Sequence, residues 1–416
     1  MPRRQVFEGI KIAQFCWGAV GTQVARELAL HGATMIRVES HRTPDAIRLA
    51  SPFKDGKPGV NRGPLSTTFQ TNGLNMSLDL SKPAGLEVAR KLIRWADIMA
   101  ESFTPGTLVK FGLDYESVRK IKPDIIYYST CQHGRYGPYA KIGGLGVQGA
   151  AGAGFYYITG WPDRDPALLL GAYTDFVSPW FLVVPLIAAL LHRRRTGEGM
   201  HLDHSQYEAA IPFLAPAILD YTVNGRIAGR TGNRHPAAVP HNAYQCMGND
   251  RWVAIAVRTD EEWQALCHAI GRPELAHDPR YATFLARRER EEEIDKVVTE
   301  WARHYTAEEA MLIMQAAGVP AGVASTCQDL LEDPQFQHRQ RFVVLNHKEI
   351  GPMVYRSPAY RLSKTPARLV KAGPCLGEDN EYIYKGILGY SDDEVTEMLA
   401  DGVITTEYDA PAVKRG

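Results

Sequence analysis

The first third of the chain alternates between short apolar runs and amphipathic stretches, and this alternation constrains the fold more than any other feature of the sequence. Residues 10–15 form an apolar run of strand length. Residues 20–30 carry apolar positions at helical spacing and stop before Gly32, and residues 35–38 are a second apolar run that ends on Glu39. The pattern predicts a strand, a helix and a strand within about thirty residues.

The same alternation continues to residue 129. We expect an amphipathic helix at 82–96, a strand at 97–103, a helix at 115–120 and a buried strand at 124–129. Parallel strands need crossover connections, and these are usually helical. The repeated pattern therefore predicts an α/β fold with a mostly parallel sheet and helices on both faces.

The amino-acid composition changes between residues 224 and 240, where Gly, Arg, Asn, Pro and His replace apolar residues. Such a stretch is typical of a linker or an active-site loop. Beyond it, residues 244–247 and 252–257 flank a Gly-Asn-Asp turn and predict a β-hairpin, and residues 285–303 predict a charged helix. We therefore expect a second, smaller α+β domain at 226–330, followed by short strands and a last helix at 392–399.

Charge and composition exclude several classes of protein. The 416 residues suggest two or three domains, and 47 basic residues balance 47 acidic ones. A balanced chain has no global reason to bind nucleic acid or an anionic membrane. The N-terminus lacks the apolar segment of a signal peptide, and the most apolar run, 180–191, is too short to span a bilayer and suits a buried helix. We expect a cytoplasmic protein with no nucleic-acid or membrane partner.

Common cofactor motifs are missing from the sequence. The turn after the first strand contains Gly18 and Gly21 but not the third glycine of a dinucleotide fingerprint, and no P-loop or nucleophile elbow occurs. His201 and His204 lie in an extended stretch, where residues three apart point to opposite faces. No two cysteines have the C-x-x-C spacing. We therefore expect no metal site and no disulfide framework.

One carboxylate does stand out. Asp175 lies in a turn of small and aromatic residues, 171–176, just before an apolar helix that we expect to begin at Ser178. An aspartate there is favoured as a helix cap, since the helix dipole stabilises its charge. The same position also suits a reactive carboxylate. Taken alone, the residues favour the cap but leave both interpretations open.

Six segments in a fixed order carry a resemblance to a known family. They are 32–39, 75–80, 96–106, 137–139, 195–203 and 362–366. Over nearly its whole length the chain resembles the class III CoA-transferases (the CaiB/BaiF family), which include formyl-CoA transferase and carnitine CoA-transferase. The 2-methylacyl-CoA racemases are relatives of that family.

The resemblance implies a function for Asp175, which falls on the catalytic aspartate of the family. Its carboxylate would attack an acyl-CoA thioester, giving an aspartyl mixed anhydride and CoA thiolate. The thiolate would then form an aspartyl-CoA thioester, from which CoA passes to an acceptor carboxylic acid. Backbone N–H groups at a helix N-terminus would stabilise the anionic intermediates. The resemblance implies no tightly bound cofactor, with coenzyme A and acyl-CoA as substrates.

The resemblance also implies a set of CoA-binding residues in the loops after the strands. They are Glu39, Arg42, Ser102, Phe103, Lys110, Phe111 and Lys141. The two lysines would neutralise phosphates, and one of the two phenylalanines would border the adenine or the pantetheine.

The fold implied by the resemblance is a Rossmann-like large domain made from both chain ends. Residues 1–225 and 331–416 would form it, with residues 226–330 as the small domain. Family members form interlocked dimers, so we expect a homodimer or a heteromer with a paralogous subunit.

Departures from the family bear on specificity. A racemase would need a histidine as a second acid/base, but residues 143–146 read Gly-Gly-Leu-Gly. Residues 232–235, Gly-Asn-Arg-His, replace a tetraglycine loop. The aromatic segment 155–157 with Trp161 suggests a larger or aromatic acyl group, and dicarboxylic acids are also candidate acceptors. The alternatives to a CoA-transferase are a racemase or isomerase on the same fold and a partner subunit of a heteromeric transferase.

Overall fold

The centre of the protein is a six-stranded parallel sheet. The computed structural model describes residues 5–169 and 171–406, and the strand order is β3-β2-β1-β4-β5-β6 with every neighbouring pair parallel. The strands are β1 (Lys11–Gln14), β2 (Thr34–Glu39), β3 (Leu74–Ser77), β4 (Ile98–Glu101), β5 (Ile126–Cys131) and β6 (Met200–Ser205). The α/β fold predicted from the alternating pattern is confirmed.

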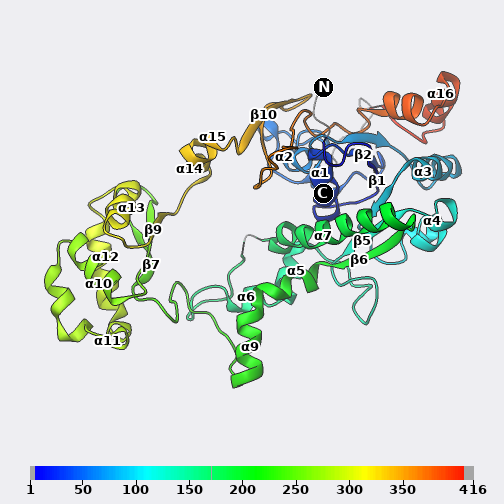
Figure 1. Cartoon of the computed structure of the whole chain (residues 1–416). Coiled ribbons are helices and arrows are strands. Elements are labelled where there is room, and N and C mark those ends of the chain that lie inside the picture. The colour runs from blue at the N-terminus through cyan, green and yellow to red at the C-terminus, as the bar shows by residue number, and fades with distance from the viewer. Residues whose placement is uncertain (1–4, 170, 407–416) are drawn as a thin grey trace. The chain divides into compact units, whose positions relative to one another are not determined.

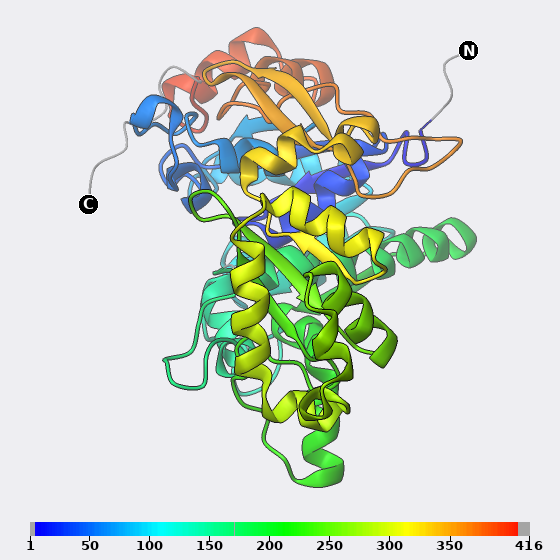
Figure 2. The ribbon, with the colours of Figure 1, turned by 90° about the vertical axis from the view of Figure 1, so that its left-hand side faces the viewer.

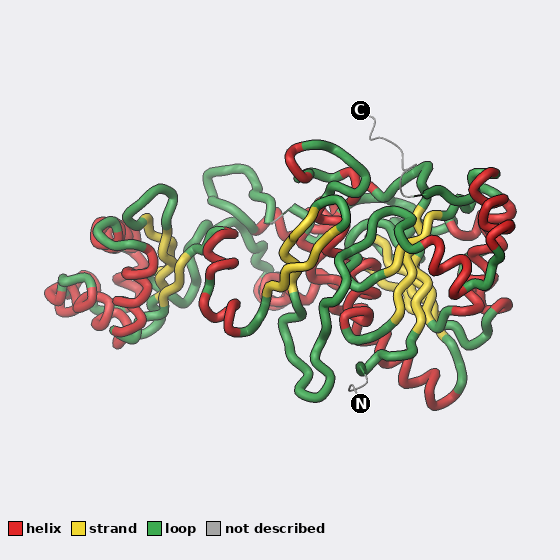
Figure 3. Tube along the Cα trace, turned by 90° about the horizontal axis from the view of Figure 1, so that it is seen from above, coloured by secondary structure: helices red, strands yellow, loops and turns green. Residues whose placement is uncertain are grey.

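Helices cover both faces of this sheet (Figure 3). On one face α1 (Val20–Leu30) packs with α7 (Tyr173–Thr196), and Val24, Leu28 and Leu182 are buried against Ile12 and Ile98. On the other face α3 (Pro83–Trp95) and α4 (Tyr115–Ile121) bury their apolar stripes. Two hydrophobic cores, one on each face, therefore hold the sheet.

The C-terminal part of the chain completes the same unit. Tyr384 lies in the core beside α3, and its hydroxyl donates to the carbonyl of Ser77 at 2.9 Å. The backbone N–H of Asp79 donates to the carbonyl of Val403. This segment contains the antiparallel pair β10 (Phe342–His347) and β11 (Gly351–Arg356) and the last helix α16 (Asp392–Ala400) (Figure 1). Both chain ends thus build the large unit.

The chain divides into two compact units. The large unit comprises the residues up to Phe155, Leu169–Thr222 and the residues from Gln335 onward, and the small unit comprises Tyr156–Leu168 and Val223–Pro334. The sequence-based division, at 226–330, did not place residues 156–168 with the small unit.

The small unit is built on an antiparallel sheet in the order β7-β8-β9. Its strands are β7 (His241–Gln245), β8 (Trp252–Ala256) and β9 (Ala321–Val323), and its helices include α10 (Asp260–Ala269), α11 (Phe284–Glu289), α12 (Glu291–Ala302) and α13 (Ala307–Ala316). Helix α12 packs on β7, α13 packs on β8 and β9, and α10 packs against α13 (Figure 2). Their apolar sides bury Trp263, Val298 and Met314 in a core shared with the sheet.

Three elements differ from the sequence-based expectation. Strand β3 was not predicted, because its sequence, Leu-Asn-Met-Ser, contains no apolar run. The helix expected at 285–303 is two helices, since Arg290 (φ −117°, ψ 23°) interrupts it. The apolar helix begins at Tyr173 rather than Ser178. The remaining helices are α2 (Pro64–Phe69), α5 (Gly146–Gly152), α6 (Phe155–Ile158), α8 (Gln206–Ala210), α9 (Ala215–Asn224), α14 (Cys327–Glu332) and α15 (Pro334–His338).

Helix α7 has an unusual surface for a helix of a globular unit. With 24 residues it is long and apolar enough to cross a membrane by length and composition, a test that core helices of globular proteins also pass. One side packs on α1 and the sheet through Leu182, Leu186 and Ala189. Elsewhere it exposes Trp180 and Val184. The packed side identifies α7 as a core helix with an uncovered apolar face.

Candidate active site

Asp175 lies in the first turn of α7, at the edge of the sheet where the strands end. Helix α7 leads directly into β6, which runs parallel to β5, so the helix must begin beside the carboxyl ends of the strands. The helix begins at Tyr173, and Ala172 is its N-cap residue. Asp175 is therefore not the capping residue. Its backbone N–H donates to the carbonyl of Ala172 at 3.0 Å.

The carboxylate of Asp175 is desolvated and unpaired. Within residues 5–169 and 171–406, no hydrogen bond or ion pair reaches its oxygens. Burial raises the pKa of the carboxyl from 3.8 to about 6. A carboxylate with a pKa near 6 is still mostly ionised at neutral pH and is more basic than an ordinary aspartate. Such a shifted pKa suits a reactive carboxylate, and the capping position belongs to Ala172.

Glycine residues let the backbone of α5 approach this carboxylate. A Cβ atom added to Gly146 would lie 2.4 Å from Oδ1 of Asp175, a distance that real Cβ atoms do not reach. Thr174, the neighbour of Asp175, donates from its hydroxyl to the carbonyl of Gly146 at 3.2 Å. Gly149 similarly faces the Thr174 hydroxyl. The first turns of α5 and α7 are thus packed against each other around Asp175.

Two glutamines that the sequence analysis did not identify help to hold this region. Gln23 of α1 donates from Nε2 to the carbonyl oxygen of Asp175 at 2.8 Å. Gln132, which follows β5, donates from Nε2 to the carbonyl of Leu145 and lies directly beneath Gly144. Gln23 shows no distinguishing signal in the sequence, because it is one polar residue on an amphipathic helix.

A cleft of about 200 Å³ opens at the carboxyl ends of β1 to β4. The strand order changes direction between β1 and β4, and ligands of open α/β sheets bind at such a point. There, Oγ of Ser102 accepts from the N–H of Trp17 at 2.8 Å and donates to the Trp17 carbonyl at 2.6 Å. The Trp17 and Phe103 rings lie 5.7 Å apart, and Phe111 also lines the cleft. The structure therefore brings Ser102, Phe103 and Phe111 together.

The predicted cationic residues lie on the surface around these loops. Arg42 is 63% exposed and forms an ion pair at 3.2 Å with Asp79, which lines the cleft. Lys110 and Lys141 are both exposed. Lys141 belongs to the loop that contains Gly143, and a Cβ atom added to Gly143 would lie 3.9 Å from the Thr104 hydroxyl, so this loop passes the end of β4.

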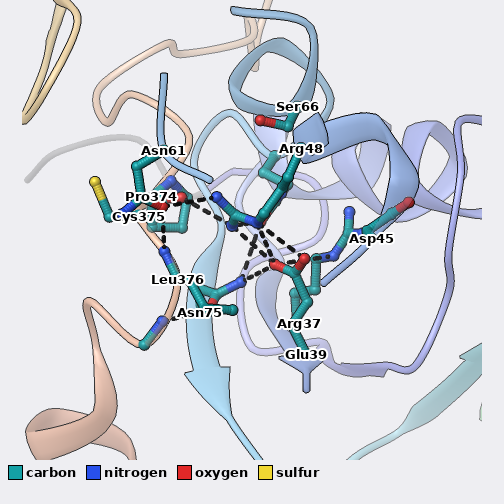
Figure 4. A network of polar contacts seen from close by, with 12 residues as sticks. Arg37, Glu39, Asp45, Arg48, Asn61, Ser66, Asn75, Pro374, Cys375 and Leu376 are labelled. Carbon is teal, nitrogen blue, oxygen red and sulfur yellow. Dashed lines mark hydrogen bonds and ion pairs between the residues drawn. The ribbon is translucent and has the colours of Figure 1, made fainter. Parts of the chain in front are cut away.

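Glu39 occupies a different environment from the other predicted CoA-binding residues (Figure 4). It is 1% exposed, and both carboxylate oxygens accept from Arg48. Burial alone would raise the pKa of Glu39, but the charges of Arg37 and Arg48 outweigh it and lower the pKa to about 2. The structure does not place Glu39 on the wall of the cleft.

The network around Glu39 links the two chain ends and reaches the turn after β1. Arg48 donates to the carbonyl of Pro374 at 3.2 Å. Asp45 accepts from Arg37 and from the backbone N–H of Gly18 at 2.9 Å. The network therefore positions the loop that carries Trp17.

The aromatic segment 155–157 and Trp161 are only partly buried. Phe155 and Tyr156 are buried, whereas Tyr157 and Trp161 are exposed.

The two histidines of β6 hydrogen-bond to different residues of β5. His201 pairs with Ser129 at 2.9 Å and His204 with Thr130 at 3.0 Å. They do not converge on one point.

Comparison with known proteins agrees with this fold. The sequence model of CoA-transferase family III matches residues 7–380. A succinyl-CoA–D-citramalate CoA-transferase of Chloroflexus aurantiacus is 34% identical over 80% of this chain and 83% of its own length. A succinate–glutarate CoA-transferase of Agrobacterium fabrum is 33% identical over 91% of this chain and 95% of its own length. The crystal structure of a CAIB/BAIF family protein from Brucella suis has a TM-score of 0.84 and 28% identity, covering 92% of this chain and 100% of that one.

These findings define the class of the protein as a CoA-transferase with an α/β fold. The chain belongs to CoA-transferase family III.

Proposed function

We propose that this protein transfers CoA from an acyl-CoA donor to a carboxylic acid through covalent intermediates on Asp175. The observation that carries the proposal is the unpaired carboxylate at the start of α7, whose pKa burial raises to about 6. A carboxylate freed of hydrogen bonds needs no desolvation before it attacks.

The proposed reaction balances without any further reagent. An oxygen of Asp175 attacks the thioester carbon, the C–S bond breaks, and CoA leaves as thiolate with the bonding pair. The thiolate attacks the aspartyl carbonyl and expels the donor acid as its carboxylate, which leaves an aspartyl-CoA thioester. The acceptor carboxylate then repeats the two steps in reverse order, and Asp175 is regenerated.

We further propose that CoA lies along the cleft at the ends of β1 to β4. Phe103 and Phe111 would border the adenine or the pantetheine, and Lys110, Lys141 and Arg42 would attract the phosphates. Ser102→Ala should raise the KM for acyl-CoA, since Ser102 fixes the Trp17 backbone through two hydrogen bonds. The double variant Lys110→Ala/Lys141→Ala should raise the same KM mainly at low ionic strength.

The names of the two relatives support succinyl-CoA as donor and a small dicarboxylic acid as acceptor. The experiment is a donor and acceptor screen with the wild type and the near-isosteric variant Asp175→Asn. The wild type should exchange CoA between succinyl-CoA and a dicarboxylic acid, and the variant should not. Full exchange by Asp175→Asn would refute the proposal. Exchange of the α-proton with deuterated water in the absence of an acceptor acid would instead identify a racemase.

We also propose a dimer, either of two identical chains or with a paralogous partner. The support is the apolar surface that α7 and α9 leave uncovered, which includes Phe181, Val184 and Leu219. Several large apolar side chains left exposed on one helix are typical of an interface. Light scattering of the purified chain should give twice the chain mass, whereas a monomer that gains activity only with a second polypeptide would identify the heteromer. The cytoplasmic location stays a prediction.

A further inference from the structure

A second cleft in the large unit lies beside the residue that follows Asp175 on α7. It measures about 330 Å³ and is bordered by α1, α7, Arg341 and the loop after β11. Phe176 and Trp180 of α7 form an apolar wall. Phe176 is 38% exposed, and its ring lies 6.4 Å from that of the buried Phe69.

Three arginines line this cleft. They are Arg26 of α1, Arg341, which precedes β10, and Arg356, the last residue of β11. Among the described residues, none of the three guanidinium groups lies within ion-pair distance of a carboxylate. Glu27 also borders the cleft, but its Oε1 already accepts from the hydroxyl of Tyr360.

Arg26 is the most deeply placed of the three. It is 6% exposed, and one of its terminal nitrogens donates to the carbonyl of Arg356 at 2.9 Å. Its Nε is buried and has no hydrogen-bond partner. A buried donor without an acceptor is costly, and buried charge is normally paired. The guanidinium groups of the cleft therefore offer charge and donors that suit an anionic ligand.

Burial and the neighbouring charges both destabilise the charged form of these guanidinium groups. Burial, followed by the charge of Arg356, lowers the pKa of Arg26 to about 10. Burial, followed by the charge of Arg341, also lowers the pKa of Arg356. Groups of like charge in a partly buried site favour binding of an anion, which restores their ordinary pKa values.

The cleft is connected to the nucleophile through Gln23. This side chain donates to the carbonyl of Asp175 at 2.8 Å, and its Oε1 lies 3.5 Å from a terminal nitrogen of Arg356. Phe176, the next residue along the chain after Asp175, lines the cleft. Gln23 and Phe176 therefore place the arginine cleft beside the first turn of α7 that carries Asp175.

We propose that the cleft formed by Arg26, Arg341 and Arg356 binds the free carboxylate of a dicarboxylic acyl group while its other carboxyl reacts at Asp175. This inference rests on the proposed CoA transfer and adds the residues that select the substrate class. Arginine suits the task because its planar donors bind a carboxylate in two-point fashion. Phe176 and Trp180 would contact the methylene groups between the two carboxyls.

CoA phosphates are a second source of anions, and the test separates the two. Succinyl-CoA and butyryl-CoA have the same chain length and the same phosphates but differ in the free carboxylate. We would measure kcat/KM for exchange of each with its own labelled acid in the wild type, Arg341→Gln, Arg356→Gln and Arg356→Lys. The control is Arg94→Gln, an exposed arginine of α3.

The glutamine variants should lose roughly 10- to 100-fold with succinyl-CoA, the effect of one charge-assisted hydrogen bond. Their butyryl-CoA exchange should remain within about threefold of the wild type, and Arg356→Lys should retain part of the succinyl activity through its charge. Equal losses with both donors, or no loss with either, would overturn the inference. Calorimetric titration provides a readout apart from turnover. The wild type should bind succinate and not butyrate, and the glutamine variants should lose succinate binding.

The same experiment distinguishes failure of this inference from failure of the proposed function. If Asp175→Asn retains exchange with both donors, the proposed function is wrong. If Asp175→Asn abolishes exchange but the arginine variants do not discriminate between the donors, only the inference about the cleft is wrong. If the wild type binds succinate no better than butyrate, the inference is likewise wrong.

Discussion

Replacement of Asp175 by asparagine should make the folded protein more stable at neutral pH, although it removes the proposed nucleophile. Burial raises the pKa of this carboxyl from 3.8 to about 6. Because the folded pKa lies above the unfolded one, the folded state carries no penalty below pH 3.8 and the full penalty above about pH 6. The shift corresponds to about 3 kcal/mol of free energy of unfolding. Asparagine cannot ionise, so the variant should gain up to that amount.

The assay is chemical denaturation of wild type and Asp175→Asn at a series of pH values. The difference in free energy of unfolding should grow from about 0.5 kcal/mol at pH 4 to about 3 kcal/mol at pH 8. Asp393 provides a matched control, since it lies in the first turn of α16 and is exposed. Asp393→Asn should instead lose a few tenths of a kcal/mol, because an exposed carboxylate there interacts favourably with the helix dipole. An Asp175→Asn variant that is no more stable than wild type at pH 8, or that gains equally at pH 4, would refute the reasoning.

The remaining predictions concern catalysis and packing. The kcat/KM of the wild type should rise tenfold per pH unit up to about pH 6 and then level off, whereas an acid limb centred near pH 4 would contradict the desolvation of Asp175. Gly146→Ala should lower kcat by about 100-fold, since its Cβ would displace the carboxylate, while Gly143→Ala, with only one atom nearby at 3.9 Å, should stay within about threefold. Arg48→Met should cost about 3–5 kcal/mol in denaturation experiments because it removes three hydrogen bonds and one of two cationic partners from the buried Glu39. Arg42→Met, on a side chain that is 63% exposed, should cost less than about 1 kcal/mol.

The sequence predicts the regular part of the sheet well because its signals are local. The helix expected at 20–30 is α1, and the strands expected around it are β1 and β2. In each case an apolar period of 3.6 or a short apolar run is complete within one segment. Strand β3 was missed because the polar residues Asn75 and Ser77 interrupt its apolar run.

The start of α7 shows how a local signal misleads. Ser178 followed by Pro179 is a typical helix start, since serine caps helices and proline suits the first turn. In the structure both residues lie inside the helix and are buried. Packing against α1 and α5 extends the helix back to Tyr173, which moves Asp175 from a loop into the first helical turn.

The residues predicted or proposed to bind substrates show the same contrast between local and long-range information. The cluster of Ser102, Phe103 and Phe111 comes from one stretch of chain, so a family resemblance locates it. The arginine cleft gathers Arg26 and Arg356, which are 330 positions apart. No spacing rule connects residues at that separation, and only the folded chain brings them together. Glu39 lies at the end of its strand as predicted, but the sequence does not reveal that Arg48 encloses it.

Chemical trapping of Asp175 tests the central claim most directly. The protein would be incubated with succinyl-CoA, treated with hydroxylamine or with borohydride, digested and analysed by mass spectrometry. Covalent catalysis through Asp175 predicts a hydroxamate or a reduced side chain at residue 175 that depends on the acyl-CoA and is absent from Asp175→Asn. Active protein that turns over succinyl-CoA while its residue 175 stays unmodified, or that is modified at another residue instead, would contradict it.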